Sequence, residues 1–392
     1  MTSVREDETT QQPAVYPFIE HLARRFGCTR ILELTPAMLL GRDLQGNPGA
    51  EDAAAVCFFE HELDSPRVRE ALHRLADEAR VVVVSTASDL DSLDVEFRGQ
   101  NLAVLSRGND GTPPTAFSAV AFITAYNEAD IIGSTIEHLL AEGLGVYLID
   151  NWSTDGTWEI AQGFVSRGLV GVERFPLDGP GPHFELRALL RRVEELAVTI
   201  RADWFVHVDA DERRESPWPA ISLREGLWRV DRRGFNAVDH TILTFPSVDE
   251  GFEHGSDPER YFRHFEFGRN PGHFRQIKAW KRGNRRVDLA TEGGHDVSFE
   301  GRRIFPFNFL TKHYPIRSQA HGERKVLRER QSRWSPAERA DGWHIQYDLL
   351  RPGQSFLHDP ATLELFDADD FHRRYLVERL TRVGIPRPKA LR

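Results

Sequence analysis

The chain has 392 residues, of which 40% are hydrophobic, and this length and composition accommodate two or three domains with ordinary cores. Its formal net charge of −10 at pH 7 argues against a general nucleic-acid-binding protein, so nucleic acid is not an expected partner. We find no apolar run long enough to cross a bilayer and no secretory signal, which makes the cytoplasm the expected compartment.

The first part of the chain predicts a polar, disordered tail over residues 1–12 and a small α/β module over residues 13–112. Helices are expected over 18–26 and 65–79, and strands over 30–34, 54–60 and 80–86. This order resembles a truncated, Rossmann-like class I methyltransferase core. Glu33, however, is followed by Leu34-Thr-Pro-Ala-Met38 and not by the glycine-rich turn that lets a backbone approach a cofactor. The module is therefore expected to bind no S-adenosylmethionine. Docking, dimerisation and acceptor recognition stay open as its role.

A second α/β pattern follows the glycine- and proline-rich linker at residues 108–114. An apolar strand over residues 118–124 leads into a helix that Asn127 is expected to cap. Another strand over residues 145–150 and another helix, from about Thr157 to Ser166, come next. This β-α-β-α order is typical of the opening half of a nucleotide-binding sheet.

The most informative stretch is residues 204–211, an apolar run that ends in two carboxylates, Asp209 and Asp211. Alternate side chains of an extended chain share a face, so both should emerge together at the carboxyl end of a strand. Ligands bind at this edge of open α/β sheets, and two oxygen ligands there suit a divalent cation that bridges phosphates. Asp-x-Asp alone is common, so the interpretation depends on the motifs around it.

Four motifs in this order resemble those of family 2-type glycosyltransferases with the GT-A fold. They are Thr124-Ala-Tyr-Asn-Glu128, Asp150-Asn-Trp-Ser-Thr-Asp-Gly-Thr157, Asp209-Ala-Asp211 and Lys312-His-Tyr-Pro-Ile-Arg-Ser318, the last resembling a signature of one bacterial subgroup. The resemblance covers residues 116–330. It implies an α/β fold with a GT-A nucleotide-diphospho-sugar transferase domain there, followed by a charged, largely helical C-terminal extension over residues 331–392.

The resemblance also implies the reaction: transfer of a sugar from a nucleotide-sugar donor to a hydroxyl of an unknown glycan, lipid-linked or natural-product acceptor, with inversion. It places donor contacts on strand ends and loops, at Ala125, Tyr126, Asn127, Glu128, Asp150, Asn151, Asp155 and Asp209, and a second positive contact at Arg187 on the helix between the two halves. Arg187 is equally compatible with an ordinary surface arginine. The implied ligands of the cation, Mn²⁺ or Mg²⁺, are Asp209, Asp211 and His313, and imidazole suits Mn²⁺ better.

An inverting transfer needs a base within hydrogen-bond reach of the acceptor hydroxyl. Asp296 is the first candidate and Asp239 the alternative, while His295 beside Asp296 is a second choice as metal ligand or a further acceptor-side group. Residues 235–285 are rich in aromatic and arginine side chains. They predict either an acceptor cleft or a core wall with a solvated basic face.

Three other interpretations stay open. A nucleotidyltransferase would normally carry a glycine-rich phosphate loop near its first strand, and residues 124–128 contain no glycine. A non-catalytic nucleotide-sugar-binding scaffold would not need the intact carboxylates at Asp209 and Asp211. A bifunctional methyltransferase-glycosyltransferase is disfavoured by Thr35-Pro-Ala37 after the first strand. A homodimer is compatible with the sequence, which reveals neither the donor base nor the transferred sugar.

Overall fold

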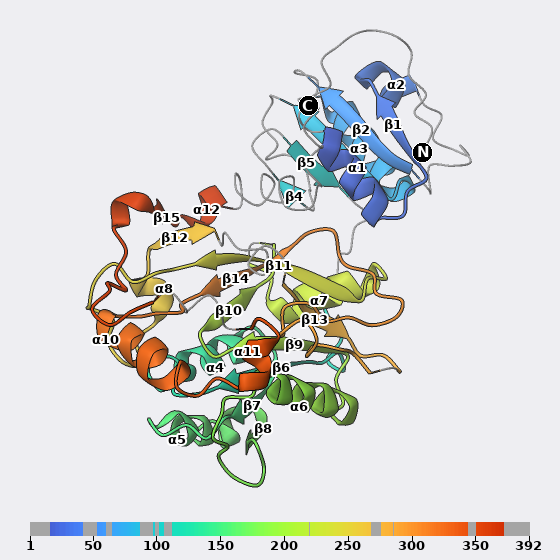
Figure 1. The fold of residues 1–392 in the computed structure, drawn as a ribbon. Coiled ribbons are helices and arrows are strands. Elements are labelled where there is room, and N and C mark those ends of the chain that lie inside the picture. The colour runs from blue at the N-terminus through green and yellow to red at the C-terminus, as the bar shows by residue number, and fades with distance from the viewer. Residues whose placement is uncertain are drawn as a thin grey trace. The chain divides into compact units, whose positions relative to one another are not determined.

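The protein is described by a computed structural model that covers residues 16–41, 53–59, 65–86, 97–98, 102–105, 112–218, 220–267, 276–284, 286–343 and 350–371. The chain divides into two compact units (Figure 1). The first consists of Met1–Gly111, Pro306–Asn308 and Asp367–Arg392, and the second of Thr112–Phe305 and Phe309–Phe366. The tail expected over residues 1–12 lies outside the described residues, as does most of the expected linker.

The first unit contains a five-stranded sheet in the order β1-β2-β3-β5-β4. Its strands are β1 (Arg30–Leu34), β2 (Ala53–Phe59), β3 (Val81–Thr86), β4 (Phe97–Arg98) and β5 (Leu102–Leu105), and its helices are α1 (Tyr16–Arg25), α2 (Pro36–Gly41) and α3 (Pro66–Glu78). β1, β2 and β3 are parallel, whereas β5 is antiparallel to β3. The expected α/β module is confirmed here. Helix α2, which begins directly after β1, was not predicted.

The second unit is built on a mixed sheet in the order β10-β14-β11-β13-β9-β6-β7-β8. Its strands are β6 (Ala119–Ala125), β7 (Gly145–Asp150), β8 (Leu169–Arg174), β9 (Trp204–Asp209), β10 (Glu212–Glu215), β11 (Ala237–Thr244), β13 (Ile277–Lys281) and β14 (Phe309–His313); β12 (His264–Phe267) and β15 (Glu364–Leu365) pair off this path. The strands β8, β7, β6 and β9 are parallel to one another, as a nucleotide-binding half-sheet requires. The mixed α/β fold agrees with the GT-A-type domain predicted from the sequence.

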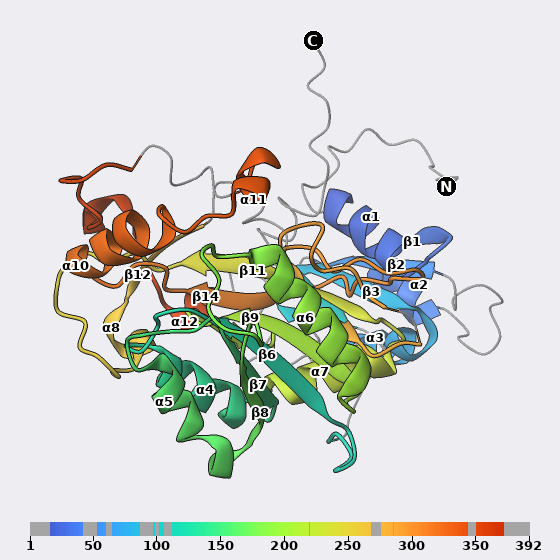
Figure 2. The same ribbon diagram turned by 60° about the horizontal axis from the view of Figure 1, so that its bottom comes forward.

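The helices of the second unit are α4 (Ile132–Ala141), α5 (Thr157–Gln162), the 3₁₀ turn η2 (Val165–Arg167), α6 (Leu186–Thr199), α7 (Leu223–Arg232), α8 (Pro258–Tyr261), α10 (Gln319–Gly322), the π-helix η3 (Glu323–Arg330), α11 (Pro336–Ala340) and the 3₁₀ turn η5 (Pro360–Thr362); α12 (Ala368–Asp370) follows in the first unit. Leu189, Leu190 and Val193 of α6 pack against Phe122 and Phe205, and Figure 2 shows this helix lying across the strands. None of the described helices is both long and apolar enough to cross a membrane.

Two helix predictions need correction. Asn127 does not cap α4, which begins at Ile132, because Asn127 lies in the left-handed region with φ 53°. The helix expected to end near Ser166 ends at Gln162 and gives way to a 3₁₀ turn. The largely helical extension expected after residue 330 is also not clearly seen: the described helices there, α11, η5 and α12, have five, three and three residues.

The chain order creates a switch point beside β6. From β6 the chain continues to β7 and β8 on one side, and β9 then pairs with β6 on the other side. The register aligns Thr124 with Asp209 and Ala125 with Asp150, so the ends of three strands meet at one edge. Ligands of open α/β sheets bind at such an edge.

We predict that the core under α6 limits the stability of the second unit. Phe122 is fully buried and its ring stacks on that of Phe205 at a centroid distance of 5.5 Å. Phe122→Ala should lower the free energy of unfolding by about 3–5 kcal/mol, because it leaves a cavity in a packed core. Urea unfolding followed by tryptophan fluorescence measures the change. Val170→Ala, at a position that is 50% exposed, is the control and should stay within about 0.5 kcal/mol. A comparable loss in both variants would contradict the prediction.

Candidate active site

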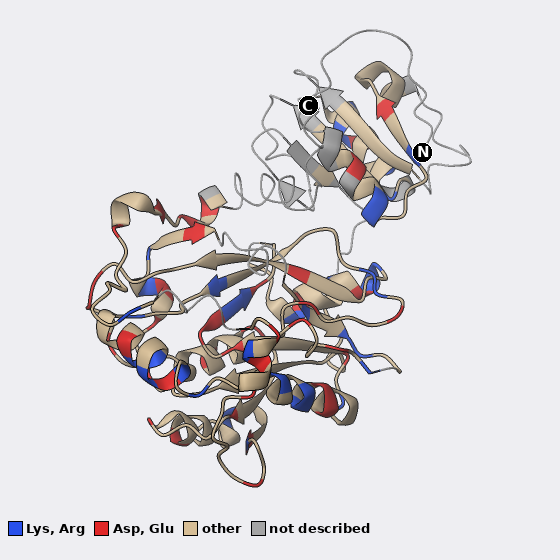
Figure 3. Ribbon diagram, viewed as in Figure 1, with Lys and Arg blue, Asp and Glu red and all other residues tan. Residues whose placement is uncertain are grey.

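A cavity of about 220 Å³ lies at the edge of the sheet where β6 and β9 end. Seven candidate site residues from the sequence line it: Ala125, Tyr126, Glu128, Asp209, Asp211, His295 and His313. The tertiary structure adds a second group to the wall, namely His207, Lys278, Lys325, Glu329 and Arg330. The cavity therefore combines carboxylates, imidazoles and cations. Figure 3 shows that charged residues of both signs also lie on β10 beside it.

Each carboxylate of the Asp-x-Asp motif is bound to a lysine from a distant part of the chain. Asp209 Oδ2 lies 2.8 Å from Lys278 Nζ, and Asp211 Oδ2 lies 2.7 Å from Lys325 Nζ. Burial alone would raise the pKa of Asp211, but the charge of Lys325 and the nearby His313 hold this pKa well below its ordinary value. Burial would also raise the pKa of Asp209, but the charge of Lys278 holds it below its ordinary value. Both carboxylates are therefore ionised near neutral pH, as ligands of a cation must be.

The remaining oxygen of Asp211 faces an imidazole. His313, at the end of β14, places its Nε2 3.6 Å from Asp211 Oδ1, and the two atoms can reach one cation between them. A carboxylate and an imidazole are a donor set that Mn²⁺ accepts. These residues therefore fit a divalent cation held by Asp211 and His313, whereas Asp209 Oδ2 is already bound to Lys278.

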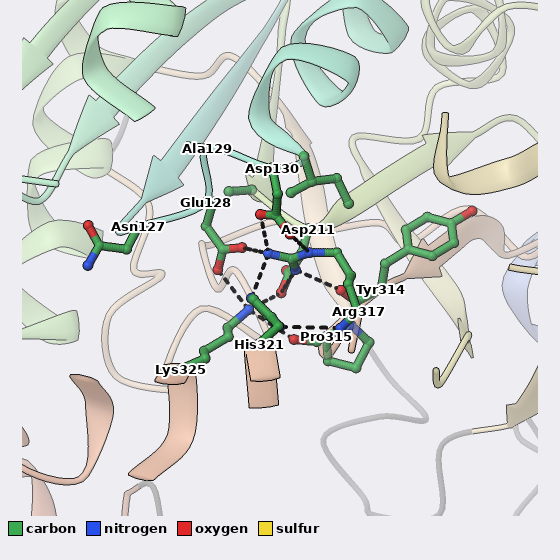
Figure 4. A network of polar contacts seen from close by, with 12 residues as sticks. Asn127, Glu128, Ala129, Asp130, Asp211, Tyr314, Pro315, Arg317, His321 and Lys325 are labelled. Carbon is green, nitrogen blue, oxygen red and sulfur yellow. Dashed lines mark hydrogen bonds and ion pairs between the residues drawn. The ribbon is translucent and has the colours of Figure 1, made fainter. Parts of the chain in front are cut away.

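A neighbouring acidic cluster already holds a protein cation. Ligand atoms of Glu128, Asp130 and His321 all lie within 4.8 Å of one another. The Arg317 guanidinium lies among them, and its NH2 group is 2.5 Å from Glu128 Oε2, 2.7 Å from Asp130 Oδ1 and 2.8 Å from His321 Nε2 (Figure 4). We therefore assign this cluster to the guanidinium and not to a metal.

Asp150 has an unsatisfied oxygen at the end of β7. The side chain is fully buried, and its Oδ2 accepts a hydrogen bond from the Ser153 backbone at 3.0 Å. Among the described residues, no donor bonds to its Oδ1. Burial raises the pKa of this carboxyl group. Buried polar atoms are rarely left without a partner, so an N–H group of a bound ligand would satisfy the Oδ1 atom of Asp150.

The other predicted donor residues mostly connect the loops around the cavity. Asn127 Oδ1 accepts from the Thr154 backbone at 2.8 Å, and its Nδ2 donates to Glu329 at 3.0 Å. Asp155 accepts from the Ala129 backbone at 3.0 Å, and Asn151 donates to the Phe175 carbonyl at 2.9 Å. The ring of Tyr126 is covered by the guanidinium of Arg333, whose Cζ lies 4.2 Å from the ring centroid.

Like Asn127, Asp150, Asn151 and Asp155, three further predicted residues lie outside the cavity wall and bind other groups. Arg187, the expected second positive contact with the donor, pairs with Asp341 at 2.6 Å. Asp296 forms an ion pair with Arg302, and Asp239 Oδ1 accepts backbone hydrogen bonds from residues 240 and 276 at 2.9 and 2.8 Å. His295, the neighbour of Asp296, does line the cavity.

Sequence reasoning missed the lysines that neutralise the motif. Lys278 lies within the apolar run of β13. A lysine is rarely buried without a charged partner, so its place in this strand could have predicted a buried ion pair. Lys325 lies in the charged segment Glu323–Arg330, which matches none of the four sequence motifs. No local sequence feature distinguishes Lys325 from the arginines around it. Its contact with Asp211 distinguishes it, and only the tertiary structure shows that contact.

Residues 120–182 match the family model described as glycosyl transferase family 2. This match confirms the resemblance to the family over these residues. No curated protein matches the chain significantly. Among solved structures, the UDP complex of S. aureus TarS 1-349 is 13% identical with a TM-score of 0.24, over 38% of this chain and 40% of that chain. UDP-glucose pyrophosphorylase complexed with UDP-glucose is 9% identical with a TM-score of 0.21, over 46% of this chain and 73% of that chain.

We predict a pH dependence of stability that is caused by His207. Burial lowers the pKa of this imidazole to about 3, whereas in the unfolded chain it titrates near its ordinary value of 6.5. Between these values the unfolded state binds a proton that the folded state does not. Stability must therefore fall as the pH drops through this window.

His207→Gln should remove this contribution. The slope of unfolding free energy against pH, measured by urea unfolding from about pH 6 to about pH 4.5, should decrease by about 1.4 kcal/mol per pH unit. The exposed His254 provides a matched control, and His254→Gln should keep the wild-type slope. Equal slopes in the wild type and in His207→Gln would contradict the prediction.

Proposed function

Starting from a chain whose residues 120–182 match glycosyl transferase family 2, we propose that the protein transfers a sugar from a nucleotide-sugar donor to an acceptor hydroxyl with the help of a divalent cation. The observation that supports this proposal best is the convergence of three motif segments on one cavity. Thr124 to Tyr126, Asp209 with Asp211, and His313 come from separate strand ends and line the same space. Inversion at the sugar carbon is part of the proposal.

The nucleoside end of the donor is assigned to β6 and β7. The unpartnered Asp150 Oδ1 would accept a base N–H, and a carboxylate is a suitable acceptor for it. Tyr126 offers a ring on which a base can stack, a position that the Arg333 guanidinium now covers. The cavity of about 220 Å³ is small for a whole nucleotide sugar, so donor binding should displace Arg333 from this ring.

The diphosphate end is assigned to the strand ends of β9 and β14. Asp211 and His313 would hold the cation, Mn²⁺ or Mg²⁺, and Asp209, fixed by Lys278, would contact the ribose or the same cation. The bound cation would supply neutralisation of the charge that develops on the leaving diphosphate. The protein's own part is to orient the donor and to keep both carboxylates ionised.

The acceptor base is the least constrained element. Asp296 and Asp239 are the carboxylates proposed from the sequence, but both bind other protein groups. His295 lies on the cavity wall, and its Nδ1 is 3.1 Å from the side-chain amide of Gln276, which fixes the ring. We therefore assign the acceptor side to His295 and keep Asp296 as the competing candidate.

The metal site predicts the behaviour of Asp211. A thermal-shift panel of UDP-, GDP- and dTDP-sugars with Mn²⁺ selects the donor, because a ligand that binds only the folded state stabilises it. With that donor, Asp211→Asn should lower the turnover rate by on the order of 100-fold or more, and EDTA should do the same to the wild type. His313→Ala should weaken metal affinity, so excess Mn²⁺ restores part of the rate. Asp178→Asn, at an exposed position outside the cavity wall, is the control. Full turnover in EDTA would exclude the metal role.

The acceptor assignment is tested by comparing two neighbours. His295→Gln should lower kcat while donor and metal affinity stay nearly unchanged, because a base acts only in the transition state. Asp296→Asn should have the smaller effect, since its partner is Arg302. The two variants are compared by steady-state kinetics and by donor titration. A loss of kcat confined to Asp296→Asn would return the base role to that carboxylate, and no loss in either would direct attention to Asp239.

A further inference from the structure

The ammonium group of Lys325 is surrounded by oxygen atoms, as a bound metal cation would be. Its ammonium lies 2.7 Å from Asp211 Oδ2, 2.7 Å from Glu128 Oε1 and 3.1 Å from the Pro315 carbonyl (Figure 4). An ammonium group has three N–H donors, and three acceptors satisfy them. The residue is 5% exposed, so this charge is removed from bulk solvent together with those of its partners.

The helix that carries Lys325 explains how it reaches this position. The segment Glu323–Arg330 is a π-helix, in which hydrogen bonds connect residues five apart. Residues four and five apart therefore share a face, whereas an α-helix aligns residues three and four apart. Lys325, Glu329 and Arg330 all line the cavity as a result. The π-helix thus presents positive charge to the strand-end carboxylates.

A second buried cation lies near the same carboxylate. Arg317 Nη1 is 4.0 Å from Asp211 Oδ2, and the guanidinium binds Glu128 and Asp130 as well. The local set has three carboxylates, Glu128, Asp130 and Asp211, against three cations, Lys325, Arg317 and Arg330, the last 4.0 Å from Glu128 Oε1, which leaves no net charge. A divalent cation added at Asp211 would make this buried set net positive. At such short distances in a partly desolvated site the repulsion is strong.

We propose that Lys325 makes divalent-cation binding at Asp211 and His313 conditional on the donor diphosphate. The negative charge of a diphosphate offsets the repulsion between the metal and Lys325, so that metal and diphosphate bind together more tightly than either binds alone. Linkage makes the effect reciprocal: the metal strengthens diphosphate binding by the same factor. The inference rests on the proposed function, since it names a positioning residue of the same site.

The test measures Mn²⁺ binding without any phosphate present. Lys325→Gln removes the charge but keeps a hydrogen-bond donor, Lys325→Arg keeps the charge, and Lys281→Gln makes the same substitution at a half-exposed lysine paired with Asp231. Titration followed by the electron paramagnetic resonance of free Mn²⁺ should show about tenfold tighter binding or more in Lys325→Gln. Lys325→Arg and Lys281→Gln should match the wild type. Unchanged affinity in folded Lys325→Gln, judged by circular dichroism, would overturn the proposal.

A measurement on the wild type needs no variant. Thermal unfolding is followed with Mn²⁺ alone, with inorganic pyrophosphate alone and with both. The combined shift should clearly exceed the sum of the separate shifts, and simple additivity would overturn the proposal even if Lys325→Gln fails to fold. Because no sugar donor is used, absence of glycosyl transfer with every donor in the panel would refute the proposed function without altering this result. Unchanged Mn²⁺ affinity in Lys325→Gln alongside normal transfer would refute only the inference.

Discussion

The Arg317 guanidinium holds together the segments that form the cavity. It is almost fully buried, and it binds Glu128 and Asp130 from the loop after β6, a backbone carbonyl after β14, and His321 at the start of the helical segment. A buried guanidinium that lost these acceptors would destabilise the fold by several kcal/mol. Each segment must therefore bring its acceptor to the same point, and the position of Asp211 beside them follows from this constraint.

The same rule of charge pairing governs the rest of the cavity. Lys278 lies between Asp209 and Glu212, and Lys325 lies between Asp211 and Glu128. Buried charges require partners of opposite sign, and the two lysines hold the pKa values of the buried Asp209 and Asp211 below their ordinary range. The site thereby keeps a high density of ionised groups with little net charge. Such an arrangement suits a ligand that itself brings both a diphosphate and a cation.

The sequence was sufficient to predict the strands that are marked by a local hydrophobic pattern. β6, β7 and β9 were predicted nearly to the residue, because each is an apolar run that ends at a polar turn. The predicted start of α4 was wrong because Asn127 forms hydrogen bonds with the Thr154 backbone and with Glu329, which lie far along the chain. Those contacts fix the residue in a left-handed loop conformation that its capping propensity does not reveal.

The sequence by itself determined that carboxylates stand at the ends of parallel strands, since the two-residue repeat of a strand and the turn after it are local properties. It also determined that His313 follows a strand, and that Glu128 opens the loop after β6. Only the tertiary structure decided which cations meet these groups. Lys278 is 69 residues from Asp209, and Lys325 is 114 residues from Asp211. Two charges form an ion pair when they are close in space, and the packing of remote segments sets that distance. No local sequence pattern could therefore have revealed these pairs.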